Sequence, residues 1–138
     1  MLEACSVAPN CLGKVHSGLQ LAAENVVDQV KEGVKQAQIA HPGYTLVLTG
    51  HSLGGALAQL VGVALVAEGL DFKIVTFGSF RVGDPEFAQF AQGEVEHYRV
   101  TAGRDLVTFY PFNVMGYQHS GQELWFDGSD LKVCGERH

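Results

Sequence analysis

A glycine-rich segment, residues 50–55, separates two strongly apolar stretches of this sequence. The stretch before it, residues 44–49, is short and rich in residues that favour strands, which is typical of a buried strand. The stretch after it, residues 56–68, is apolar nearly all round and predicts a buried helix that ends at Gly69. A strand joined so closely to a helix is part of a βαβ unit, and this constrains the chain to an α/β architecture.

The rest of the chain continues the alternation. Apolar residues at spacings of three and four predict a helix over residues 17–40, and Ser17 with Gln20 resembles a capping box at its start. Further elements are expected as strands at 72–77, 97–100 and 123–126, and as a short helix from 84 to about 92, with Asp84 as N-cap.

This order predicts a mostly parallel sheet with flanking helices. In such sheets the functional residues gather at the carboxyl ends of the strands. We therefore expect residues 50–55, 78–81 and 101–105 to lie along one edge.

Composition narrows the function classes. The chain has 138 residues and a formal net charge of −6, with no cluster of lysine and arginine. We treat residues 1–138 as one domain and expect neither nucleic acid nor an anionic membrane surface as a partner. The longest apolar run, residues 56–67, is shorter than the roughly 20 residues that span a bilayer, so no transmembrane segment is expected. Residues 1–5 do not resemble a signal peptide.

The three cysteines leave two interpretations open. Cys5 and Cys11 flank Pro9-Asn10, so a small disulfide loop is plausible, and free buried thiols are about equally well supported. Cys134 has no obvious partner. Because the spacing fits neither CxxC nor a mixed cysteine and histidine pattern, we expect no metal site, and nothing in the sequence calls for a cofactor.

The glycine-rich segment contains a GxSxG pentapeptide, Gly50-His51-Ser52-Leu53-Gly54. Between a buried strand and a buried helix, this pattern predicts a nucleophile elbow, a sharp strained turn that projects the serine hydroxyl above the sheet. Gly50 and Gly54 would be small because a Cβ atom at either position would clash across the turn. The alternative is a plain βα loop that binds phosphate at the helix N-terminus, but Ala56 stands where a P-loop would have lysine.

Five stretches in the same order, VHSGL, LTGHSLGGALA, FGSFRVGDPEFA, HYRVTAGRDLV and GYQHSGQELWF, resemble the class 3 (fungal-type) lipases. This family is a branch of the α/β-hydrolases and includes feruloyl esterases. The resemblance runs from about Cys11 to Cys134. It implies an α/β-hydrolase core, here incomplete and apparently truncated at both ends.

The resemblance also implies roles for individual residues. Ser52 would be the nucleophile, and the backbone N–H of Leu53 would donate to the oxyanion. Asp105 occupies the position of the family's triad aspartate, consistent with the chain order serine, aspartate, histidine. From spacing alone, a carboxylate that caps a loop is an equally good interpretation of Asp105.

The family's general base lies in a DHxxYFG-like segment that this sequence does not contain. Of the six histidines, His119 follows Asp105 and is a possible surrogate base, although a packing role is the better interpretation. His138 is the last residue and arrives too early to match the family's base. The remaining four, His16, His41, His51 and His97, are expected at the surface or in the packing.

The predicted function is that of a serine carboxylester hydrolase, a lipase or esterase of lipid metabolism that works through an acyl-enzyme. Two alternatives remain: a catalytically inactive fragment that lacks the base histidine, or an acyltransferase. The expected partner is an ester or lipid substrate, at a lipid–water interface. A sheet without its first strands would expose an apolar edge and favour self-association. By resemblance, the protein is expected to be secreted.

Overall fold

The computed structural model describes residues 1–134. Its centre is a five-stranded sheet in the order β3-β4-β5-β6-β7. The strands are β3 (Leu46–His51), β4 (Phe72–Phe77), β5 (Glu96–Ala102), β6 (Gln122–Phe126) and β7 (Leu131–Cys134). The first four run parallel, and β7 pairs antiparallel with β6. The mostly parallel sheet expected from the sequence is confirmed.

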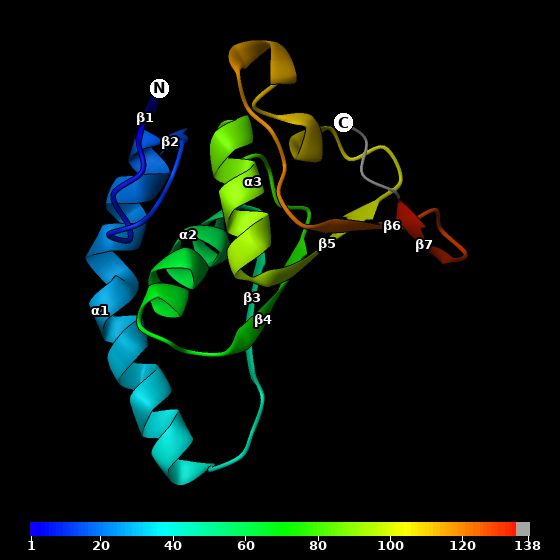
Figure 1. Cartoon of the computed structure of the whole chain (residues 1–138). Coiled ribbons are helices and arrows are strands. Elements are labelled where there is room, and N and C mark those ends of the chain that lie inside the picture. Colours follow the sequence, from blue (N-terminus) through cyan, green and yellow to red (C-terminus); the bar gives the residue numbers. More distant parts are fainter. Residues whose placement is uncertain (135–138) are drawn as a thin grey trace.

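Three α-helices lie on one side of this sheet (Figure 1). They are α1 (Ser17–Ala40), α2 (Leu53–Ala67) and α3 (Pro85–Glu94). Helix α2 packs on β3 and β4, α1 packs on α2 as an outer layer, and α3 packs against α2 and β5. None of the helices within residues 1–134 is both long and apolar enough to cross a membrane.

Helix α2 is the centre of the core because its surface is apolar on nearly every side. Small residues let it approach the sheet closely: a Cβ atom on Gly62 would lie 2.6 Å from Cδ1 of Ile74. Leu60 and Ile74 are completely buried at this contact. Asp84 caps α3 as expected, accepting a hydrogen bond from the backbone N of Phe87 at 2.9 Å.

An N-terminal hairpin was not predicted from the sequence. Strands β1 (Leu2–Ala4) and β2 (Lys14–His16) pair antiparallel, and a disulfide joins Cys5 to Cys11 within the loop between them. The structure thus decides between the two interpretations of these cysteines, while Cys134 is a free thiol. Strands of three residues are too short to show an alternating pattern.

The capping box expected at Ser17 and Gln20 is wrong. No side chain caps the start of α1. The amide of Gln20 instead donates to Glu3 Oε1 and to the carbonyl of Ala4, and its oxygen accepts from the backbone N of Ser6. The residue therefore ties the hairpin to the helix, because it is buried beneath the hairpin rather than exposed at the helix end.

The side of the sheet away from the helices carries a row of apolar side chains, which we call the open face. Alternation along the strands places there Val47, Val75, Phe77, Val100, Leu124, Phe126, Leu131 and Val133. Within residues 1–134 none of these belongs to the buried core cluster.

Candidate active site

Ser52 alone forms the turn between β3 and α2, since β3 ends at His51 and α2 begins at Leu53. The expected strand and helix therefore extend into residues 50–55, and the sharp turn lies at Ser52 alone. Ser52 has φ 51° and ψ −118°, and no other non-glycine residue among those described has a positive φ. Such a conformation costs on the order of 1–3 kcal/mol and persists only where the surroundings impose it.

The surroundings of Ser52 impose this conformation from both sides. Its N–H donates to the carbonyl of Phe77 on β4 at 3.0 Å, and its carbonyl accepts from the N–H of Gly55 and of Ala56. A Cβ atom on Gly50 would lie 2.3 Å from the carbonyl carbon of Gly54, so only glycine fits there. The turn is locked between the neighbouring strand and the first turn of α2.

The predicted clash of a Cβ atom at Gly54 across the turn is wrong. A Cβ atom there would meet nothing within 4 Å. The second tight position is Gly55, where a Cβ atom would lie 2.9 Å from Cβ of Ser79 and 3.0 Å from the carbonyl oxygen of Gly50. The helix turns Gly54 away from the strand and Gly55 toward it, which the spacing of the motif does not reveal.

Leu53 is the first residue of α2 and is exposed. The first N–H groups of a helix have no partner within the helix, and they carry the positive end of its dipole. The N–H of Leu53 therefore lies beside the Ser52 side chain as an available donor. This geometry suits an oxyanion, and the role assigned to Leu53 stays a prediction.

Asp105 follows the carboxyl end of β5 and caps the short 3-10 helix η1 (Leu106–Phe109). Its Oδ1 accepts from the N–H of Val107 at 3.0 Å. The capping interpretation from the sequence is thus correct for one oxygen, while the other faces Gly78: a Cβ atom on Gly78 would lie 3.2 Å from Oδ2 and 3.6 Å from Nε2 of His51. Gly78 has φ +56°, which also favours glycine.

Ser52, Gly78 and Asp105 follow the carboxyl ends of three adjacent parallel strands, β3, β4 and β5. The edge predicted from the sequence is confirmed. Gly78 is the residue whose importance the sequence did not show, because its lack of a side chain leaves a space that Asp105 and the ring of His51 both border. A glycine directly after a buried strand was the available signal.

Two histidines are held inside the fold. Nε2 of His97 lies 3.0 Å from Oγ1 of Thr76, and Nε2 of His119 lies 2.6 Å from the carbonyl oxygen of Thr108. Burial, with a smaller contribution from the charge of Arg99, lowers the pKa of both histidines to about 3. Both rings are therefore neutral near pH 7 and lack the pKa near neutrality that suits a general base.

Two further histidines lie against tyrosine rings. The ring of His16 faces Tyr117, and that of His41 faces Tyr44. Within residues 1–134, Ser52 Oγ makes no hydrogen bond with a histidine. His138 lies outside the described residues.

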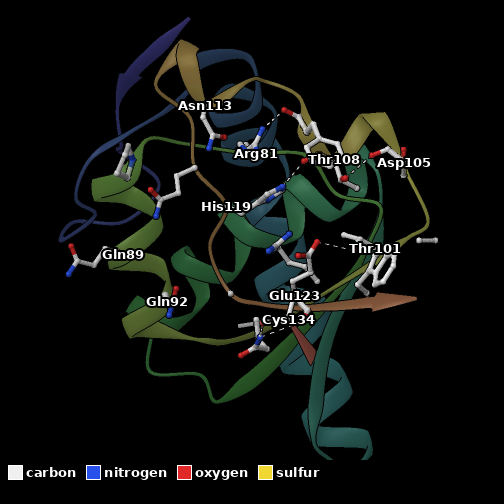
Figure 2. A pocket seen from close by; sticks show the side chains of 18 of the residues that line it. Arg81, Gln89, Gln92, Thr101, Asp105, Thr108, Asn113, His119, Glu123 and Cys134 are labelled. Atoms are coloured by element: carbon white, nitrogen blue, oxygen red, sulfur yellow. Dashed lines mark hydrogen bonds between the residues drawn. The ribbon is translucent and has the colours of Figure 1, made fainter. Parts of the chain in front are cut away.

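A cleft of about 1120 Å³ begins beside Asp105 (Figure 2). Its walls come from α3, from β5 and β6, and from the segment of residues 103–121. Arg81 braces that segment by donating to the carbonyls of Phe109 and Pro111. No group of three or more histidine, cysteine, aspartate or glutamate side chains within residues 1–134 is arranged to hold a metal ion.

The family model described as lipase (class 3) matches residues 1–115. The chain belongs to the class 3 lipase family. It is 39% identical, over 142 aligned residues, to the secreted mono- and diacylglycerol lipase 1 of Fusarium solani, an alignment that covers 96% of this chain and 42% of that protein. The fungal lipases of this family share the α/β-hydrolase fold of this chain.

Solved structures agree with the sequence match. Lipase II from Rhizopus niveus superposes with a TM-score of 0.88 at 32% identity, over 99% of this chain and 54% of that one. A triacylglycerol lipase whose catalytic centre is described as a serine protease triad superposes with a TM-score of 0.84 at 31% identity, over 96% and 53%. The chain thus spans about half the length of the class 3 lipases it matches.

Proposed function

We propose that this protein is a serine carboxylester hydrolase in which Ser52 is the nucleophile. The observation that carries the proposal is the strained φ of Ser52, held between β4 and α2 at the carboxyl edge of the sheet. Strained residues of this kind cluster at functional sites. The names of the relatives, which include mono- and diacylglycerol lipases, support an ester of a glycerolipid as substrate.

In the proposed reaction, Ser52 Oγ attacks the ester carbonyl and the N–H of Leu53 stabilises the negative oxygen. A general base takes the Oγ proton and passes it to the departing alcohol as the acyl-enzyme forms. The same base then activates the water that releases the acid. Asp105 would orient and stabilise a protonated base through Oδ2, which borders the space beside Gly78. We assign His119 a packing role, because its Nε2 is engaged with Thr108 and its pKa is about 3.

The segment next to Asp105 supports action at a lipid surface. Leu106, Phe109, Phe112 and Val114 expose their side chains within a short stretch, and Val114 is 92% exposed. Grouped exposed apolar residues mark sites that contact apolar partners. We propose that this stretch meets the lipid–water interface, and that the protein is secreted like its named relatives.

The alternative function is a protein with the same fold that lacks turnover. The observation that favours it is that Ser52 has no histidine partner within residues 1–134. An acyltransferase on the same turn would differ in the acceptor of the acyl group, an alcohol in place of water.

A fluorophosphonate probe tests the proposal directly. We expect it to label the protein, and to lose labelling in Ser52→Ala while Ser120→Ala keeps it. Hydrolysis of short-chain glycerol esters, measured with and without a competing alcohol, separates hydrolase from acyltransferase. Absence of both labelling and hydrolysis would establish the inactive alternative.

A further inference from the structure

The floor of the cleft is made of polar side chains that point to the helix side of the sheet. Arg99 and Thr101 come from β5, and Glu123 comes from β6 directly opposite Arg99. Arg99 exposes only 7% of its surface, and its Nε and Nη1 atoms are buried with no hydrogen-bond partner among the described residues. A guanidinium group with unused donors therefore lies at the base of a large cleft.

The acidic side chain opposite Arg99 makes no hydrogen bond with it among the described residues. Oε1 of Glu123 accepts from Oγ1 of Thr101 at 2.9 Å, as Figure 2 shows, and no ion pair in residues 1–134 joins Glu123 to Arg99. Arg81, the other cation of the cleft, already donates to two backbone carbonyls. Arg99 is thus the cation of this cleft whose buried donors lack a hydrogen-bond partner among residues 1–134.

A buried guanidinium without hydrogen-bond partners is unfavourable, because burial removes water and the charge of nearby Glu123 offsets only part of that loss. The lowered pKa of Arg99, which arises from its burial, has the same origin. A carboxylate is the group that best restores both the charge and the hydrogen bonds of an arginine.

His119 gives a second sign of unfilled space. Its Nε2 lies against the carbonyl of Thr108, so Nε2 donates and Nδ1 presents a lone pair. Nδ1 is buried and has no partner among the described residues. A water molecule bound beside the ligand would donate to this atom.

We propose that this cleft binds a carboxylate group, with Arg99 as its principal ligand. The source is either a free monocarboxylic acid, whose alkyl chain would lie against Phe109 and Trp125, or the carboxyl group of a polypeptide segment. The indole of Trp125 is already fixed by its hydrogen bond to the carbonyl of Gly103. The proposal does not depend on hydrolytic activity.

Isothermal titration with octanoate and with octanamide tests the chemistry. We expect octanoate to bind saturably and to raise the melting temperature, and octanamide to bind at least about tenfold more weakly, because charge-assisted hydrogen bonds are lost. Glu123→Gln should tighten octanoate binding, since it removes a negative charge beside the ligand. Arg99→Gln should abolish binding.

The source is distinguished by a short peptide with a free C-terminal carboxylate, compared with its amidated form. Preference for octanoate or for the free peptide over its neutral match, together with tighter binding in Glu123→Gln, supports the proposal and identifies the source. Equal binding of charged and neutral forms, no binding of either carboxylate, or weaker binding in Glu123→Gln would overturn it. If Arg99→Gln fails to fold, the octanoate affinity of Glu123→Gln, compared with that of the unchanged protein, tests the proposal.

Discussion

On one face of the sheet, Phe72 and Ile74 are buried beneath α2, while on the other, Phe77 is 45% exposed and Val133 is 71% exposed. Apolar side chains therefore stand on both faces, but only one face has a helical layer within residues 1–134. The covered face also changes character along the sheet, from apolar under α2 to polar at Arg99, next to α3.

The difference shows where stability and function come from. The covered face holds the packed core and the locked Ser52 turn, so changes there should be costly. The open face contributes little packing within the described residues and remains available for contact. The predictions below test this contrast, from the largest expected effect to the smallest.

Truncation on the covered face should cost most. We expect Ile74→Ala to lower the free energy of unfolding by about 4 kcal/mol, because its side chain is completely buried and Gly62 packs against it. The matched change on the open face, Val133→Ala, should cost less than about 0.5 kcal/mol. Urea denaturation measures both, and similar losses would show that the open face is covered in solution.

The second largest effect on stability is expected at the Ser52 turn. Gly50→Ala should destabilise the protein by about 3 kcal/mol, because the added methyl would lie 2.3 Å from the backbone of Gly54. The control is Gly54→Ala, which meets nothing within 4 Å and should leave stability nearly unchanged. Thermal unfolding compares the two variants, and an equal loss would mean that the turn is not packed as described.

The hairpin disulfide should contribute about 2 kcal/mol, because it closes a short loop and so restricts the unfolded chain. The Cys5→Ala, Cys11→Ala double variant should lose this amount in urea denaturation. Cys134→Ala is the control and should show no loss, since Cys134 is a free thiol. An unchanged double variant would argue against the disulfide.

Acid should weaken the fold through His97 on the covered face. Its pKa is lowered from 6.5 to about 3 by burial and by Arg99. Between these values the unfolded chain binds more protons than the folded one, so stability falls as pH drops below about 6.5. From pH 7.5 to 5.5 we expect His97 to contribute about 1 kcal/mol of loss. Denaturation of His97→Gln at both pH values should show a correspondingly smaller loss, and an unchanged loss would contradict this account.

The smallest effect on stability concerns the edge of the sheet. Strand β3 is an edge strand, and Val47 on it is 54% exposed. We propose self-association through this edge and expect Val47→Lys to reduce it, because lysine on an edge strand disfavours pairing. Stability should change by less than about 0.5 kcal/mol. Sedimentation velocity at several concentrations measures the effect, with Thr45→Lys outside the strand as control.

The sequence predicted the parallel strands, the three helices and the edge on which Ser52 and Asp105 lie, because these depend on periodic apolar patterns and glycines. It did not predict the hairpin, which depends on Gln20 finding partners distant along the chain. Nor could it distinguish Gly54 from Gly55, since the direction of a side chain within the first turn of α2 is set by the tightness of the turn.

The strained backbone of Ser52 affects which substitutions selection favours at this position. Glycine would relieve the strain at this position, so selection for stability alone favours Ser52→Gly and removes the proposed nucleophile. A library screened for thermal tolerance should therefore enrich a substitution that a library screened for ester turnover eliminates. The two screens would therefore favour different residues at position 52, while both would keep isoleucine at position 74.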